Sequence, residues 1–292
     1  MKTRKVLVTG SEGFIGKHLC RQLLEFGINV VASSDKAKNK LDVTDINQLR
    51  SIDNGVEAVV HLAAKTSVSD AINNPYHPYY TNLLGTLNVL EFSRLRKIRK
   101  FINMSSYVYG QPKYLPVDEK HPVNPHSPYH KSKLLAEQLC ENYSCDFGID
   151  IVTLRPFLLY GPFGNPHMFL PTIIQQICEH AKVFLSGKHT SRDFLFITDF
   201  VDLIRIILNE FPKGYNLYNV GHGESHELEE VALLVARLLG KEITINYDNQ
   251  IRPGDVTKMI ANISKVSNSF RWNPRISIQE GLRIIIEKSS RS

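Results

Sequence analysis

Short apolar runs alternate with longer amphipathic segments through the first half of the chain. The β-branched apolar runs predict strands at residues 5–9, 28–32, 56–62, 100–104 and 151–154. Between them, apolar positions at helical spacing predict helices at residues 14–26, 82–95 and 129–143. Strands separated by helices predict a parallel sheet with helices on both faces, which is a doubly wound, Rossmann-type α/β fold.

The second half is less regular because four prolines interrupt the passage after the last of these strands, at positions 156, 162, 166 and 171. Beyond them, the pattern predicts helices near residues 172–180, 199–209, 227–239 and after residue 277, and a strand at residues 217–220. We expect a main domain over residues 1–160 and a smaller C-terminal α/β lobe over residues 161–292. Part of residues 199–220 is expected to return to the main domain.

Composition excludes several classes of protein. The 292 residues are 42% hydrophobic and 22% charged, which is ordinary for a soluble globular protein, and the formal charge of +6 is mild. The basic cluster at residues 94–100 is interpreted as a solvated helix end, so no nucleic-acid partner is expected. No apolar run approaches the roughly 20 residues of a membrane helix, and no membrane association is expected.

Cysteine usage and the start of the chain bear on the compartment. Residues 1–5 lead directly into the first predicted strand, so no signal peptide is expected. The four cysteines lack the spacing of a metal site, and no metal is expected. Reduced thiols are typical of a cytoplasmic protein. The cysteines are Cys20, Cys140, Cys145 and Cys178.

A glycine-rich loop, TGSEGFIG, joins the first predicted strand to the first predicted helix. Its three glycines suit a dinucleotide, because they allow a tight turn, a close approach of the pyrophosphate and tight packing of helix on strand. The free amides at the start of the helix would face the phosphates. The residues expected to bind the cofactor here are Gly10, Glu12, Gly13, Phe14, Ile15 and Gly16.

The choice between NAD and NADP stays open from the sequence. The acidic residue that binds a ribose 2′-hydroxyl should end the second strand, where Ser34 and Asp35 are the candidates. Serine with the nearby Lys36 would instead suit a 2′-phosphate. Asp42 and Val43, in the LDVTD segment, are expected beside the adenine.

Tyr129 and Lys133 are four residues apart in SPYHKSK, within a predicted helix, and therefore project from one face. A nearby ammonium group favours phenolate, so this pair predicts a lowered pKa for Tyr129 and a proton-transfer group near neutral pH. Beside a dinucleotide loop, such a pair indicates hydride chemistry.

The ordered motifs TGSEGFIG, LDVTD, HLAA, NMSSYVYG and SPYHKSK resemble the extended short-chain dehydrogenase/reductase superfamily, in its NAD-dependent epimerase/dehydratase family. The later segments LRPFLLYGP, SRDFLFITDFVD and IRPGDVTK extend the resemblance over nearly the whole chain. It implies that Tyr129 is the catalytic acid/base, that Lys133 supports it and binds the nicotinamide ribose, and that Asn82 lies near the active site. Counting back from Tyr109-Gly110 places the catalytic hydroxyl at Ser105, with Ser106 as its neighbour.

The resemblance also implies the other contacts of the site. A run passing the cofactor is expected at His61, Leu62, Ala63 and Ala64. A sugar diphosphate would be held by the guanidinium groups of Arg192 and Arg252, with Asp255 facing a nucleotide ribose. Ser106 and Tyr107 stand where related dehydratases carry an Asp-Glu pair, which disfavours dehydration. Leu158 stands where many 4-epimerases carry an asparagine that touches the diphosphate.

Three functions follow as hypotheses. The first is an NAD(P)-dependent sugar-nucleotide epimerase acting at C4 through a 4-keto sugar. The second is an NAD(P)H-dependent sugar-nucleotide 4-ketoreductase, which the same residues would serve. The third is a non-catalytic dinucleotide-binding regulatory protein, for which the catalytic residues would be unnecessary. The resemblance also implies a homodimer formed through the helices near residues 82–95 and 129–143.

Overall fold

The computed structural model describes residues 3–33, 41–248 and 256–289. A six-stranded parallel sheet forms its centre, in the order β10-β5-β4-β3-β1-β2. This order places β1 inside the sheet. The chain adds β2 on one side of β1 and then adds the later strands on the other side, as in doubly wound folds. The strands are β1 (Lys5–Thr9), β2 (Asn29–Ser33), β3 (Ala58–His61), β4 (Lys100–Met104), β5 (Asp150–Pro156) and β10 (Tyr215–Val220).

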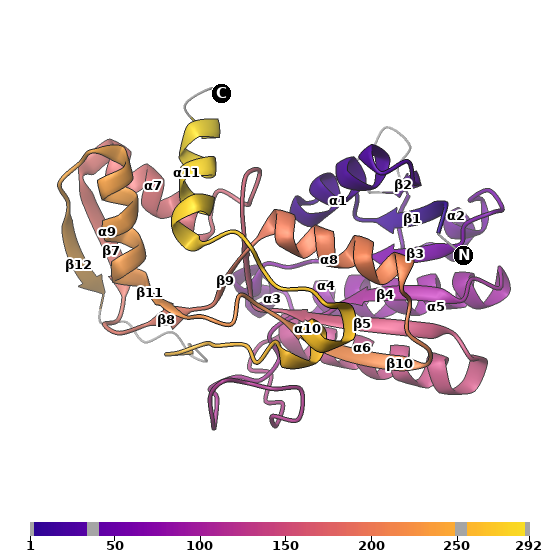
Figure 1. Ribbon diagram of the computed structural model, residues 1–292. Helices are drawn as coiled ribbons and strands as arrows, with labels where there is room; N and C mark the ends of the chain where they lie inside the picture. The colour runs from indigo at the N-terminus through magenta and orange to yellow at the C-terminus, as the bar shows by residue number, and fades with distance from the viewer. Residues whose placement is uncertain (1–2, 34–40, 249–255, 290–292) are drawn as a thin grey trace.

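Helices cover both faces of this sheet (Figure 1). Helices α1 (Phe14–Glu25) and α8 (Ile197–Asn209) pack together on one face. Helices α5 (Gly85–Leu95) and α6 (Pro128–Phe147), with the short α2 (Ile46–Arg50), cover the other. Because side chains alternate along a strand, β1 contributes to both cores, and this explains its uninterrupted apolar sequence.

Helix α6 has clear local signals at both ends. The Ser127 side chain accepts a hydrogen bond from the His130 amide, and Pro128 occupies the first turn, where a missing amide hydrogen costs nothing. Gly148 ends the helix in the left-handed conformation, with φ of 63°. Ser127 and Pro128 therefore fix the start of the helix immediately before Tyr129.

The segment before α5 is less regular than its sequence suggests. Two short helices, α3 (Val68–Asn73) and α4 (Tyr76–Pro78), lead into a π-helical turn, η1 (Tyr79–Leu84). Such turns are rare and often lie at functional sites. Here the turn carries the buried Asn82.

The remaining elements, apart from α10 (Ser264–Phe270), form a smaller group at one end of the sheet, seen at the left of Figure 1, whereas α10 packs on β10 and α8 of the larger part. The two-stranded sheets of the smaller group pair β7 with β12 in parallel, β8 with β11 antiparallel and β6 with β9 in parallel. The strands are β6 (Leu158–Tyr160), β7 (Lys182–Ser186), β8 (Ser191–Arg192), β9 (Phe194–Phe196), β11 (His226–Glu227) and β12 (Thr244–Asp248). The helices are α7 (Phe169–His180), α9 (Leu228–Leu239) and α11 (Ile278–Ser289).

The architecture confirms the predicted doubly wound α/β fold, and β10 is the part of residues 199–220 that joins the main sheet. One hydrophobic core continues from β1 through α7, α9 and α11, so the larger and smaller parts share buried side chains. Across the described part of the chain, every helix is too short or too polar to span a bilayer.

Candidate active site

The glycine loop lies at the carboxyl edge of the sheet, between β1 and α1. Gly10 has φ of 69°, and a Cβ placed on it would come 2.7 Å from the Ala63 nitrogen. A Cβ on Gly16 would collide with the Gly10 carbonyl. Only glycine therefore fits at both positions. Gly13 is the N-cap of α1, whose first amides face away from the helix. This cradle of backbone, without side chains, suits a pyrophosphate.

Two buried hydroxyl groups beside the loop also fit a polar ligand. The side chains of Ser11 and Ser33 are almost fully buried, and neither Oγ atom has a hydrogen-bond partner among the described residues. The Ser11 amide donates to the Ser33 carbonyl over 3.2 Å, so the two residues are adjacent. Buried hydroxyls are normally hydrogen-bonded. A bound cofactor would supply the hydrogen-bond partners that Ser11 and Ser33 lack.

The run after β3 lies against the glycine loop. The Thr9 hydroxyl accepts hydrogen bonds from the amides of Leu62, at 3.1 Å, and Ala63, at 3.2 Å. Leu62, Ala63 and Ala64 are half-buried. This places the predicted cofactor-facing run next to Gly10.

Other predicted cofactor residues have varied surroundings. Phe14 and Ile15 are half-buried against the core, whereas Glu12 is exposed and lies 3.9 Å from Lys17. Asp42 accepts hydrogen bonds from the amide and hydroxyl of Thr44, and Val43 is buried in the core. The candidates for the 2′ end, Ser34 and Asp35, lie outside the described residues.

Helix α6 presents Tyr129 and Lys133 one turn apart. The Tyr129 phenol is hydrogen-bonded to the Ser106 side chain, which comes from the loop after β4. Lys133 is buried, and burial lowers its pKa to about 8. The site therefore brings a phenol and a hydroxyl together, with a buried amine one helical turn away, at the edge where ligands bind in open α/β sheets.

The direction of the Tyr129 pKa differs from the sequence prediction. Burial raises the pKa of the phenol, and the Ser106 hydrogen bond lowers it by less. The predicted lowering assumed that the Lys133 charge dominates. In the protein alone, removal from water outweighs other effects because it penalises the charged phenolate.

Ser105 is oriented differently from the expected catalytic hydroxyl. Its amide donates to the Leu154 carbonyl, which extends the β4–β5 pairing, and its hydroxyl donates to the Glu137 carboxylate. Successive side chains of an extended segment point to opposite sides, so Ser106, rather than Ser105, is the serine in contact with Tyr129. The catalytic role that the resemblance implies for Ser105 stays a prediction, and its neighbour Ser106 is the second candidate for that role.

Glu137 forms a buried ion pair with Arg155 on β5. The carboxylate accepts hydrogen bonds from Nε, at 2.8 Å, and Nη2, at 2.6 Å, and both side chains are 5% exposed. The Arg155 Nη1 donates to the Tyr109 hydroxyl over 2.8 Å. The pair thus holds both ends of the loop that carries Ser106. Its sequence signal was available, because Glu137 lies one turn beyond Lys133 on the same helix face.

The predicted substrate residues are partly described. Arg192, on β8, donates from Nη1 to the carbonyls of Ser191, at 2.9 Å, and Val256, at 2.5 Å. Arg252 and Asp255 lie outside the described residues. Leu158 is half-buried in the core, and its amide donates to the Asp193 carbonyl over 3.1 Å. Its side chain offers no group for a diphosphate.

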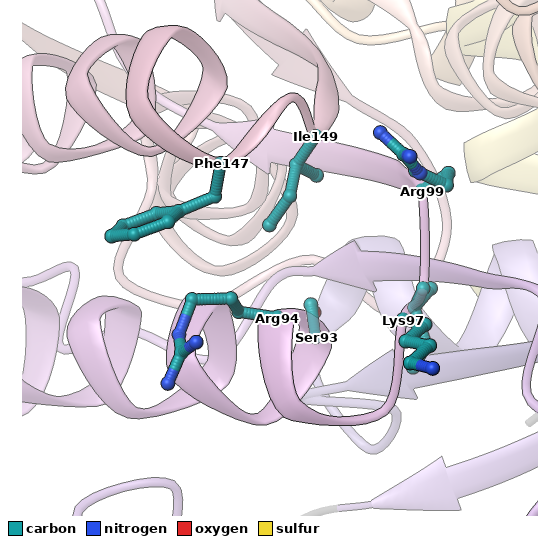
Figure 2. Close-up of a pocket in the computed structure, with 7 residues that line it drawn as sticks. Ser93, Arg94, Lys97, Arg99, Phe147 and Ile149 are labelled. Atoms are coloured by element: carbon teal, nitrogen blue, oxygen red, sulfur yellow. The ribbon is translucent and has the colours of Figure 1, made fainter.

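A hollow of about 310 Å³ between the ends of α5 and α6 is a weaker candidate site. Its basic side chains diverge, as Figure 2 shows for Arg94, Lys97 and Arg99. Arg94 is bound by both oxygens of Glu91, and Arg99 donates to the Gly148 carbonyl. The hollow also lies at the opposite end of α6 from Tyr129. These groups do not converge on a ligand.

Comparison with known proteins agrees with this geometry. Residues 6–221 match the model of the NAD dependent epimerase/dehydratase family. A putative UDP-glucose 4-epimerase of Methanocaldococcus jannaschii is 31% identical over 96% of this chain and 97% of its own length.

Two solved structures share the fold over almost their full length. RMD from Pseudomonas aeruginosa, complexed with NADPH, has a TM-score of 0.90 and 28% identity, covering 99% of this chain and 100% of its own. UDP-glucose 4-epimerase from Thermus thermophilus, complexed with NAD, has a TM-score of 0.84 and 28% identity, covering 97% and 98%. With a family match over most of the chain and a glycine cradle that fits the cofactor, the protein belongs to the NAD-dependent epimerase/dehydratase family.

Proposed function

We propose that this enzyme is a sugar-nucleotide epimerase that inverts C4 of a nucleotide-diphosphate sugar. The observation that carries the proposal is the contact between the Tyr129 phenol and the Ser106 hydroxyl, one helical turn from Lys133. The relatives named UDP-glucose 4-epimerase support this reaction and make a UDP-sugar the first substrate to test.

The side chains have separate roles in this reaction. Tyr129 removes the proton of the C4 hydroxyl, and Ser106 holds the same oxygen by a hydrogen bond. NAD, when bound, supplies the hydride acceptor and donor. After the 4-keto sugar has turned over in the site, C4 would regain its hydride on the other face and Tyr129 returns the proton to the oxygen, so that no net oxidation occurs. Lys133 donates to the nicotinamide ribose and favours the phenolate.

The remaining predicted contacts complete the proposal. The cofactor is held by residues 10–16, the run 62–64 and Asp42–Val43, together with Ser34 and Asp35. The sugar nucleotide is held by Ser106 and Tyr129 with Arg192, Arg252 and Asp255. Residues 1–160, with part of 199–220, then form the dinucleotide-binding domain, and residues 161–292 mainly bind substrate. Ser105 acts through the position of its loop, because its hydroxyl is bound to Glu137.

A 4-ketoreductase is the second candidate function. It is favoured by two observations: the NADPH complex of RMD, and a serine rather than an acidic residue, Ser33, at the last position of β2. Such an enzyme would release oxidised cofactor at every turnover, whereas an epimerase returns the hydride to its own substrate.

One experiment separates these functions. The purified protein is incubated with UDP-glucose or UDP-galactose, and separately with NADPH and a 4-keto sugar nucleotide, and the C4 configuration and the absorbance of reduced nicotinamide are followed together. Interconversion with no net change in absorbance supports the epimerase. Stoichiometric consumption of NADPH by a 4-keto sugar nucleotide supports the reductase. Tyr129→Phe serves as the control for a regulatory protein: biological activity that survives this change with NAD binding intact excludes both enzymes.

We further propose that two copies associate through an apolar stripe on α3, α4 and η1. Val68, Ile72, Tyr76 and Tyr80 follow one another at four-residue intervals and are 37%, 61%, 65% and 43% exposed. The rings of Tyr76 and Tyr80 stack with centroids 5.5 Å apart. On the helices for which the resemblance implies a dimer contact, Leu83, Leu84 and Leu87 are half-buried, Leu90 is fully buried and Leu95 is 46% exposed.

The cytoplasm is the compartment we propose for this enzyme. The four cysteines are all free thiols, as is usual in reducing compartments.

A further inference from the structure

A chain of buried hydrogen bonds starts at Thr9, directly before the glycine loop. The Thr9 Oγ1 atom accepts from the amides of Leu62 and Ala63 and lies 2.8 Å from Nδ1 of His61. A hydroxyl has one hydrogen to donate and two lone pairs to accept with. The Ala63 amide uses one lone pair, and the Leu62 amide is shared between the Thr9 hydroxyl and the Thr9 carbonyl, the latter at 3.2 Å. The Thr9 hydrogen is therefore left to point to Nδ1 of His61, as the Thr86 side of the ring also requires. That nitrogen is therefore unprotonated.

The other side of the imidazole continues the chain. Nε2 of His61 lies 3.1 Å from the Thr86 hydroxyl, which itself donates to the Asn82 carbonyl over 2.6 Å. Since Thr86 uses its hydrogen on that carbonyl, it accepts from Nε2–H. Every hydrogen in the chain is thus assigned, and His61 is the neutral Nε2–H tautomer. Burial, with the Lys133 charge, lowers the pKa of His61 to about 3, which keeps the ring in this form.

The chain ends at the catalytic helix. The Asn82 side chain accepts from the Lys65 amide at 2.8 Å and donates to the Lys65 carbonyl at 3.1 Å. It also donates to the Ser132 hydroxyl at 2.9 Å, and Ser132 donates to the Tyr129 carbonyl at 2.7 Å. Asn82 therefore ties the end of the cofactor-facing run to α6, beside the acid/base.

We propose that His61 is a positioning residue that sets the spacing between the cofactor-facing run, residues 62–65, and the catalytic helix α6. One end of its ring fixes Leu62 and Ala63 against Gly10 through Thr9, and the other end fixes Asn82 through Thr86. The inference rests on the proposed function only in that NAD lies between these two walls. No atom of His61 needs to touch the cofactor or the substrate.

The test uses valine and serine variants of the two threonines in the full-length protein. Thr9→Val and Thr86→Val keep the shape of the side chain and remove its hydroxyl. Thr9→Ser and Thr86→Ser keep the hydroxyl. Thr86→Val is the more informative change, because Thr86 lies on α5, away from the glycine loop. Thr153→Val, in β5, is the matched control because Thr153 is equally buried and lies outside this chain. NAD affinity is measured by calorimetry and corrected for the folded fraction.

We expect both valine variants to bind NAD about tenfold more weakly, which corresponds to one lost buried hydrogen bond. The serine variants and Thr153→Val should bind like the unchanged protein. If Thr86→Val binds NAD with unchanged affinity, the positioning role is wrong and the chain only stabilises the fold.

A second measurement does not depend on the threonine variants folding. Nitrogen NMR of the unchanged protein, with His61→Phe to assign the signals, reports which imidazole nitrogen carries hydrogen. A protonated Nε2 and a bare Nδ1 at neutral pH support the assignment. A hydrogen on Nδ1, or a doubly protonated ring, overturns it. Neither measurement uses a sugar nucleotide, so either result stands apart from the test of the proposed epimerase.

Discussion

At the scale of single residues, the serine in contact with Tyr129 determines how the phenol is activated. We predict that Ser106→Ala lowers kcat about 10²-fold, because it removes a donor placed at the reacting oxygen. The Ser106 hydrogen bond lowers the pKa of Tyr129, so its loss raises that pKa. Since the phenolate is the active base, the rising limb of the pH–rate profile should move to higher pH. Steady-state rates across the pH range measure both effects.

Ser105→Ala is the companion variant. Its hydroxyl is bound to Glu137, so we expect a loss of about 1 kcal/mol in the free energy of unfolding and a smaller decrease in kcat. A larger decrease in kcat for Ser105→Ala than for Ser106→Ala would restore Ser105 as the catalytic hydroxyl.

At this scale the sequence predicted the reactive side chains more easily than their contacts. The four-residue spacing of Tyr129 and Lys133 predicts a shared helix face, because helical periodicity is local. The choice between Ser105 and Ser106 depends on where the β4–β5 pairing ends, which is a contact between distant segments. The pKa of Tyr129 depends on burial, and no local motif reports that. His61 stood within the HLAA motif, but its two threonine partners are 52 and 25 residues away.

At the scale of elements, the ion pair of Glu137 and Arg155 joins α6 to β5. We predict that Glu137→Ala lowers the free energy of unfolding by about 3–5 kcal/mol, because it leaves a guanidinium charge buried without its partner. Glu141→Ala, one turn further along α6 and exposed, is the control and should change stability by less than about 0.5 kcal/mol. Urea denaturation measures both. Equal losses would mean that the pair contributes nothing beyond helix propensity.

Asp193 connects β8–β9 to two other segments of the smaller part. Its carboxylate accepts hydrogen bonds from the amides of His222, Gly223 and Ala261. Burial raises the pKa of Asp193 from 3.8 to about 6, although these three amides lower it. Between those values the folded protein binds a proton that the unfolded chain does not.

The sign of the resulting pH dependence follows from this difference. The contribution of Asp193 to stability is fully present below pH about 4 and is lost as the pH rises through about 6. We therefore predict that the stability of the unchanged protein, relative to Asp193→Asn, decreases over this range. Urea denaturation of both proteins at each end of the range measures the difference. An increase with pH would show that the three amides outweigh burial.

The sequence predicted elements most reliably where the segment with a regular hydrophobic pattern is long. The predicted helix at residues 129–143 corresponds to α6, which begins at Pro128 and continues beyond the predicted end to Phe147. The pairs β7–β12 and β6–β9 were not predicted, because each strand pairs with a distant segment and no regular alternation of strand and helix marks this half of the chain. The π-helical η1 has no signal separate from that of the following helix.

At the scale of the whole molecule, the apolar stripe of α3, α4 and η1 leads to a prediction about assembly. Four large apolar side chains at four-residue intervals are an unusual exposure for a monomer, whereas single exposed apolar residues are common. The stripe lies on elements that pack against α6, so a second copy seated there would also support the helix that carries Tyr129. We expect the unchanged protein to be a dimer in analytical ultracentrifugation.

Charge placed in the stripe should prevent this association, because a buried carboxylate without a partner is costly. We predict that the double variant Ile72→Glu with Tyr76→Glu sediments as a folded monomer, with an unchanged far-UV circular dichroism spectrum, since both side chains are exposed in the single chain. Leu24→Glu is the matched control: Leu24 is 59% exposed on α1, over the other face of the sheet, and this variant should remain a dimer. A monomeric parent protein, or a dimeric double variant, would contradict the proposed interface. If the double variant loses turnover together with its dimer, the second copy contributes to the order of the catalytic helix.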